Sequence, residues 1–254
     1  MDRLFIVSRD AVEDKTDRDS LILYDELKRT AARNLDYVIM DNEELPKYIT
    51  ENPQYRIRMT VPVGGIDFVR SFLEKEHARD AKMTPLEVPE YLREFTGRNY
   101  RIMKGTDIIG TSLADASKWF IKDVSELKTW NSLLYGRDVS GMIDPERLYS
   151  VSEKINILSE YRTFVYMDEV QAVQHYAGNP LVFPDANAVT QMVDTTSKHR
   201  RPDAYTLDVA VIQNKDGSTA TVPLEMHPFV SCGLYGFMPD KIGTMLEAGY
   251  RWYL

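Results

Sequence analysis

Three side chains of types that bind metal ions come from two apolar runs in the last third of the sequence. Asp208 lies within the run Leu207–Ile212, and Glu225 and His227 close the run Val222–His227. Side chains two residues apart on a strand share a face, so two paired strands can bring these groups together. Hard cations such as Mg²⁺ prefer carboxylate oxygens and often also contact phosphate. We therefore expect Asp208, Glu225 and His227 to form a Mg²⁺ site that serves nucleotide chemistry.

These residue types also occur for purely structural reasons, and a single histidine is more often structural than a ligand. Asp208 is harder to explain in that way, because an aspartate flanked by apolar residues opposes strand propensity. Breaks of a local rule often mark functional sites. The combination of Asp208 with Glu225 and His227 therefore favours the metal site.

A lysine on an apolar strand supplies a positive charge. Lys122 follows Phe120 and Ile121 and precedes Val124 by two residues. A buried ammonium needs an anionic partner, since an unpaired buried charge costs several kcal/mol, and a nucleotide phosphate would be such a partner. The alternative is a lysine on an edge strand that points to solvent, as most lysines do.

Glu160 and Arg162 lie two residues apart in a strand pattern and so share one face. In one interpretation they form a surface ion pair, which contributes about 0–1 kcal/mol. In the functional interpretation Glu160 accepts a hydrogen bond from a ribose hydroxyl or an amine. Arg162 would then neutralise a transferring phosphoryl group or a substrate carboxylate.

Composition narrows the classes of protein that the chain can belong to. It has 254 residues, 43% of them hydrophobic, enough for one large domain or two to three lobes. The net charge of −8 argues against broad nucleic-acid binding, which needs a basic surface. Cys232 is the one cysteine, so we expect no intrachain disulfide and a reducing compartment. The N-terminal apolar run is too short for a membrane span, and we expect a cytoplasmic location.

Alternating strand and helix patterns predict an α+β fold. The patterns predict helices at 20–33, 66–77, 91–95 and 240–248, and strands at 4–7, 37–40, 56–63, 118–124, 148–152, 161–166, 170–176, 204–212 and 220–227. Short turns join the last four strands into two hairpins. The P-loop, Rossmann, zincin and serine-hydrolase signatures do not occur.

The order of these features resembles the ATP-grasp ligases. It runs from a strand lysine (Lys122) through a linker strand with an acid (Glu153) and an acid-x-Arg strand (Glu160 to Arg162) to Asp208 and a Glu-x-His strand. Within that superfamily the chain is most similar to the ribosomal-protein glutamate-ligase-like branch and its small viral and bacterial relatives. The resemblance covers about residues 56–254.

The resemblance implies an N-terminal α/β lobe (1–98), a small ATP-grasp lobe (99–157) and a C-terminal metal-binding lobe (158–254), with ATP clamped between the last two. Lys122 would hold the phosphates, with Lys104 or Lys128 as a second phosphate lysine. The adenine hinge would be lined by Glu153, Lys154 and Ile155, and Glu160 would face the ribose. Mg²⁺ would be held by Asp208, Glu225 and His227, although the family usually has asparagine where His227 stands.

The resemblance also implies an activity, an ATP-dependent carboxylate–amine ligase that forms an amide through an acyl phosphate. Lys122 and Arg162 would stabilise the transferring phosphoryl group. We expect the carboxylate substrate and amine acceptor to meet Arg162, Arg201, Ser231 and Tyr235. A host-cell cytoplasmic location would follow for a viral protein. Two alternatives stay open: a kinase-like ATP-grasp phosphotransferase, and a degenerate nucleotide-binding or interaction module, the latter suggested by His227 and by the lack of a clear glycine-rich flap.

Overall fold

The structure is a computed structural model, and it describes residues 3–13, 36–52, 59–77, 83, 85–125, 130–131, 133, 137–237 and 242–254. The predicted helix at 20–33 and residues 56–58 of a predicted strand lie outside these ranges. The strands are β1 (Arg3–Ser8), β2 (Asp36–Met40), β3 (Met59–Val63), β4 (Tyr100–Lys104), β5 (Trp119–Asp123), β6 (Leu148–Glu153), β7 (Asn156–Tyr166), β8 (Glu169–Gly178), β9 (Ala204–Gln213) and β10 (Thr219–Pro228).

The α-helices are α1 (Asp10–Glu13), α3 (Leu45–Glu51), α4 (Ile66–His77), α5 (Gly105–Ile108), α6 (Ala186–Ser197) and α7 (Ile242–Tyr250). Short 3₁₀ helices are η2 (Glu90–Thr96), η3 (Ser112–Ala114), η5 (Ser140–Met142) and η6 (Arg251–Tyr253). Helices and sheets are thus mixed along the chain, and the predicted α+β class is confirmed. None of the described helices combines the length and the apolar character that crossing a membrane would require.

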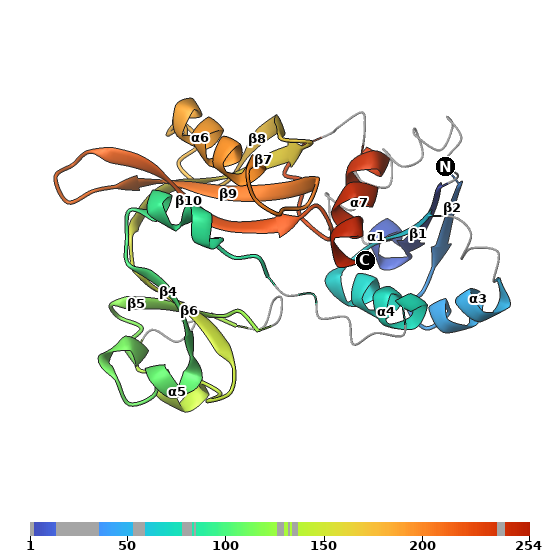
Figure 1. The fold of residues 1–254 in the computed structure, drawn as a ribbon, viewed down its shortest axis with the longest axis horizontal. Coiled ribbons are helices and arrows are strands. Elements are labelled where there is room, and N and C mark those ends of the chain that lie inside the picture. Colours follow the sequence, from blue (N-terminus) through green and yellow to red (C-terminus); the bar gives the residue numbers. More distant parts are fainter. Residues whose placement is uncertain are drawn as a thin grey trace.

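The first sheet is parallel, with strand order β2-β1-β3. Its central strand is buried from Leu4 to Val7, as expected for a parallel strand covered on both faces. Helix α4, whose bounds match the prediction, packs its apolar face on this sheet. Helix α7 joins the same core, where the rings of Phe72 and Tyr250 meet at 6.1 Å between centroids. The two ends of the described chain therefore share one core (Figure 1).

The second sheet is antiparallel, with strand order β4-β6-β5. One face packs Ile121, Tyr149 and Val151 into a core with the surrounding short helices. The other face carries Lys122, which lies opposite Ser150 in the register of β5 and β6. Alternation along β5 therefore directs Lys122 away from the core of its own sheet. The sequence patterns did not predict β4.

The third sheet is antiparallel, with strand order β10-β9-β7-β8, and it contains both predicted hairpins. Met167 and Asp168 form the turn between β7 and β8 with positive φ angles of 50° and 65°, as a two-residue type I′ turn requires. Helix α6 covers one face of the sheet (Figure 1). It was not predicted, although Asp185 caps it by accepting a hydrogen bond from the backbone N–H of Ala188.

The segment that precedes the second sheet packs on the third sheet. Val88 and Leu92 are buried with Met226, and the Met226 N–H donates to the Glu87 carbonyl at 2.8 Å. Helix α7 likewise packs on the first sheet rather than on the third. The lobe boundaries 1–98, 99–157 and 158–254 therefore stay a proposal, which the three sheets follow more closely than this segment and α7 do.

Candidate functional site

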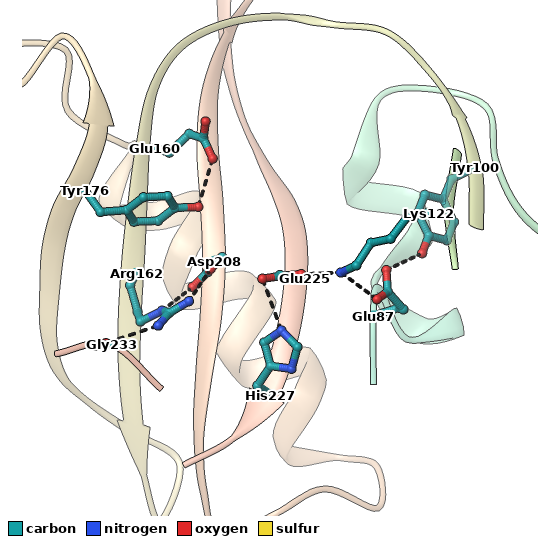
Figure 2. Close-up of polar contacts among 10 residues, drawn as sticks. All are labelled: Glu87, Tyr100, Lys122, Glu160, Arg162, Tyr176, Asp208, Glu225, His227 and Gly233. Atoms are coloured by element: carbon teal, nitrogen blue, oxygen red, sulfur yellow. Dashed lines mark hydrogen bonds and ion pairs between the residues drawn. The ribbon is translucent and has the colours of Figure 1, made fainter. Parts of the chain in front are cut away.

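Three charged residues stand in a row across the third sheet. Arg162 of β7 lies opposite Asp208 of β9, and Asp208 lies opposite Glu225 of β10 (Figure 2). Residues directly opposite one another in an antiparallel pair point to the same face. The row thus lies on the face that Lys122 approaches from the second sheet.

A β-bulge sets the position of Glu225. Pro223 pairs with Val209 and Glu225 pairs with Asp208, so Leu224 is an extra residue in β10. Without it, Glu225 would oppose Leu207 and point into the core beneath α6, because a one-residue shift exchanges the two faces of a strand. The bulge therefore brings Glu225 to the same face as Asp208.

Arg162 and Asp208 form a buried bidentate ion pair. Nε and Nη2 of Arg162 donate to the two carboxylate oxygens of Asp208 at 2.8 Å each, and Nη1 donates to the Gly233 carbonyl at 3.1 Å. The residues are 8% and 1% exposed. Burial acts to lower the pKa of Arg162, but Asp208 outweighs it and holds that pKa above its usual range. Arg162 is thus not part of an exposed ion pair with Glu160.

Lys122 of the second sheet reaches the third sheet. Its Nζ lies 2.5 Å from Glu225 Oε2 and 2.7 Å from Glu87 Oε1 (Figure 2). The Lys122 side chain is 22% exposed. Burial acts to lower its pKa, but Glu225 and Glu87 more than offset this and raise it. The alternative of a solvent-facing lysine is therefore wrong.

Sequence reasoning missed Glu87. This residue is 5% exposed and has a φ of 52°, and the Tyr100 hydroxyl donates to its Oε2 at 3.5 Å. Burial raises the pKa of Glu87 above its usual value, although Lys122 opposes the rise. A glutamate between two prolines in a connection carries no strand or helix periodicity, so the sequence offered no signal for it.

His227 contacts the other oxygen of Glu225, with 3.1 Å between Nε2 and Oε1. Burial acts to raise the pKa of Glu225, but His227 and Lys122 outweigh it and hold that pKa well below its usual range. Glu225 is thus held ionised, with one neighbour on each oxygen.

Aromatic side chains flank the other end of the row. The Tyr176 hydroxyl donates to Glu160 Oε2 at 2.9 Å, and the rings of Tyr176 and Tyr235 stack at 5.0 Å between centroids. The Arg162 guanidinium lies 5.1 Å from the Tyr235 ring centroid, within the range of a cation–π contact. Glu160 and Tyr235 therefore lie close to Arg162.

Several other predicted residues lie outside this cluster. Lys104 is exposed and pairs with Glu146 at 3.6 Å. Arg201 makes ion pairs with Asp168, on the β7–β8 turn, and with Asp203. Lys128 lies outside the described residues. Among the residues that are described, the structure thus shows no second lysine beside Lys122.

The predicted hinge and substrate loop are found between or beside the sheets. Glu153 ends β6, where its carboxylate accepts a hydrogen bond from the Asn99 N–H at 3.0 Å. Lys154 is exposed, whereas Ile155 packs on a small apolar cluster around Ala210. Ser231 donates to the Gly64 carbonyl at 2.7 Å and so ties the loop after β10 to the loop that begins α4.

The flap candidates remain without support. Tyr135 and Gly136 lie outside the described residues. Ser140 and Gly141 belong to the 3₁₀ turn η5, where Asp138 caps Ser140, and so they do not form an open glycine-rich loop.

The donor set bears on which cation could be held. Within the described ranges, no three His, Cys, Asp or Glu side chains are grouped as a ready metal site. Asp208 and Glu225 nevertheless present adjacent carboxylates, which suit Mg²⁺. His227 contacts Glu225 and adds no oxygen ligand. The residues present thus fit an oxygen-bound cation held by two carboxylates.

Comparison with known proteins identifies the family. Residues 95–245 match the family model of an ATP-grasp domain, the second family of its clade. The chain belongs to the ATP-grasp family. The predicted superfamily and the ATP-grasp fold are thereby confirmed. No curated protein sequence matches the chain.

Solved ATP-grasp structures share the fold at low sequence identity. The D-alanine–D-alanine ligase of Bacillus anthracis, complexed with ATP, is 12% identical with a TM-score of 0.52, and the match covers 100% of this chain and 99% of that one. The L-amino acid ligase of Bacillus licheniformis is 10% identical with a TM-score of 0.54, covering 99% and 75%. The N5-carboxyaminoimidazole synthetase of Staphylococcus aureus is 10% identical with a TM-score of 0.54, covering 97% and 77%.

Proposed function

We propose that the protein is an ATP-dependent, Mg²⁺-requiring carboxylate–amine ligase. The observation that carries the proposal is the meeting of Lys122 with the Asp208–Glu225 row across two sheets of an ATP-grasp fold. This arrangement places a phosphate-binding cation opposite two cation-binding carboxylates. Such a set suits the phosphates of a nucleotide and the metal that bridges them.

The remaining site residues can be given roles along the nucleotide. Ile155 and Ala210 would contact the base, because they form an apolar cluster next to the hinge. Glu160, fixed by Tyr176, would accept a hydrogen bond from the ribose. Asp208 and Glu225 would hold Mg²⁺, which neutralises charge on the phosphates when it is bound. His227 would orient Glu225 rather than bind the metal, since its Nε2 already faces that carboxylate.

In the reaction that we propose, a substrate carboxylate oxygen forms a bond to the γ-phosphorus of ATP. The bond from that phosphorus to the β,γ-bridging oxygen breaks, and ADP leaves with the electron pair. Lys122 and Arg162 stabilise charge on the transferring phosphoryl oxygens. An amine nitrogen then bonds to the acyl carbon, phosphate leaves, and the amine loses a proton to form the amide.

The buried cations must change partners for this chemistry to occur. Lys122 is paired with Glu225, and Arg162 is paired with Asp208 through both of its oxygens. Phosphate oxygens would draw Lys122 away from Glu225, and the metal would take its place on that carboxylate. Binding of nucleotide and metal is therefore expected to be mutually dependent.

A nucleotide-binding module without turnover is the second candidate. It is favoured by the cations that already occupy both carboxylates and by His227, which stands where the family resemblance expects asparagine. Stoichiometric nucleotide binding without ADP formation would support this candidate.

The deciding experiment is incubation of the full chain with ATP, Mg²⁺ and a library of carboxylates and amines, followed by measurement of ADP and mass analysis of products. Ligation yields an amide and free phosphate, whereas a phosphotransferase leaves a phosphorylated acceptor. Lys122→Ala serves as the inactive control. Failure of the wild type both to bind ATP and to form ADP would remove the proposal.

A further inference from the structure

Glu87 lies where three parts of the chain meet. It belongs to the segment between the first and second sheets, and its carbonyl accepts a hydrogen bond from Met226 of the third sheet at 2.8 Å. Its side chain reaches Lys122 of the second sheet, with 2.7 Å between Oε1 and Nζ (Figure 2). One residue thus links the connecting segment to both sheets of the site.

The backbone of Glu87 has an uncommon conformation. Its φ of 52° lies in the left-handed region, which residues other than glycine seldom adopt. The bridge to Met226 and the burial of the next residue, Val88, hold it there. Such conformations persist where the surrounding structure fixes them, and they cluster at functional sites. Here the conformation accompanies a side chain that is buried and directed at Lys122.

The two partners of Lys122 have different surroundings. Glu225 stands beside Asp208 on the sheet face that we assign to Mg²⁺. Glu87 lies off that row, and the neighbour of its second oxygen is the Tyr100 hydroxyl at 3.5 Å. Burial raises the pKa of Tyr100 to about 12, so this hydroxyl stays protonated and can donate. A metal on Asp208 and Glu225 would therefore engage Glu225 and leave Glu87 in place.

Loss of Glu225 as a partner would leave Lys122 in difficulty without Glu87. The Lys122 side chain is 22% exposed, and a largely buried cation with no counter-ion is strongly unfavourable. A second carboxylate that stays in place removes this obstacle. It also keeps the long lysine side chain extended toward the third sheet.

We propose that Glu87 is a positioning residue, which holds Lys122 toward the nucleotide phosphates and remains its counter-ion when Glu225 binds the metal. The inference rests on the proposed nucleotide site. It assigns a role to a residue of the connecting segment, which lies before the part of the chain that matches the family model.

The test is a double-mutant cycle on the full chain, with calorimetric binding of a non-hydrolysable ATP analogue at several Mg²⁺ concentrations. Glu87→Gln is expected to weaken binding about tenfold or more, the range for a lost hydrogen bond to a charged group. It should also raise the Mg²⁺ concentration needed for half-maximal binding, because Lys122 then competes with the metal for Glu225. Combined with Lys122→Met, Glu87→Gln should add no further loss.

A matched control is Glu90→Gln, which removes an exposed carboxylate three residues further along the same segment. It should leave both the affinity and the Mg²⁺ dependence unchanged. Glu87→Asp keeps the charge on a shorter side chain, and we expect an affinity between those of wild type and Glu87→Gln. It serves as the test variant if Glu87→Gln does not fold.

Two outcomes would overturn the inference in distinguishable ways. If the wild type binds nucleotide but the losses from Glu87→Gln and Lys122→Met simply add, Glu87 acts independently of Lys122, and only its positioning role is lost. If the wild type binds no nucleotide at any Mg²⁺ concentration, the proposed function fails and the role of Glu87 fails with it.

Discussion

Lys122 and Glu225 are 103 residues apart in the sequence, yet their Nζ and Oε2 atoms lie 2.5 Å apart. The contact joins the second sheet to the third through one buried ion pair. A ligand that binds between these residues must break the contact and offer each of them a replacement partner. The phosphates of a nucleotide and the metal that accompanies them would do so.

Lys122→Ala should weaken Mg²⁺–nucleotide binding about tenfold to a hundredfold, because a hydrogen-bonding charge is removed from the phosphates. Titration calorimetry measures this directly. The exposed Lys198→Ala on the α6–β9 loop is the control and should bind as the wild type does. Unchanged affinity in Lys122→Ala would show that the phosphates lie elsewhere.

Asp208→Asn should abolish ADP formation and also reduce stability by about 3–5 kcal/mol, since it breaks a buried ion pair and leaves Arg162 without its counter-ion. The free energy of unfolding in urea is the measurement. Asp194→Asn on the exposed face of α6 provides the control. A variant with wild-type turnover would remove Asp208 from the metal site.

Glu225→Gln should abolish turnover with a smaller loss of stability than Asp208→Asn, because Lys122 keeps Glu87 as a partner. Comparison of the two urea midpoints tests this ranking. Equal losses would mean that Glu87 does not compensate for the missing charge.

Glu160→Ala should reduce the preference for ATP over its 2′- and 3′-deoxy analogues, because the carboxylate that we assign to the ribose is removed. Tyr176→Phe should have a weaker effect in the same direction, as it removes the 2.9 Å hydrogen bond that orients Glu160. Competition binding with the three nucleotides gives the ratios. A preference that persists in Glu160→Ala would assign the ribose contact to another group.

On acidification Glu87 should take up a proton before Glu225. The pKa of Glu87 is raised, mainly by burial, so its contribution to stability is full below the unfolded-state pKa and is lost as pH rises through its folded-state pKa. The pKa of Glu225 is lowered, so its contribution is present above the unfolded-state pKa and is lost as pH falls through the folded-state pKa. Carboxyl-carbon NMR titration would show this order, and the reverse order would contradict the arrangement at Lys122.

The sequence predicted those parts of the fold in which one pattern decides the structure. Helix α4 shows strong amphipathic periodicity, and the hairpin strands alternate clearly, so their prediction was close. Helix α6 was missed because β-branched and small polar residues dilute its apolar stripe. Strand β4 was missed because an alternation of charged and apolar residues over five positions is a weak signal.

The site was predicted in part, for physical reasons. Asp208 stood out because it opposes strand propensity, and Lys122 stood out because its neighbours are apolar. Glu87 could not be found, since its role comes from a tertiary contact and a left-handed backbone that leave no periodic trace. The partner of Arg162 was equally hidden, because it depends on the pairing of β7 with β9.

Helix α7 has a consequence for how the protein is made. It completes the core around β1, β3 and α4, although it is the last of these elements to leave the ribosome. Contacts between distant parts of a chain form slowly, because the intervening loop must close first. The nascent first sheet must therefore wait, with apolar surface uncovered, until translation is nearly over, which makes it a natural client for chaperones.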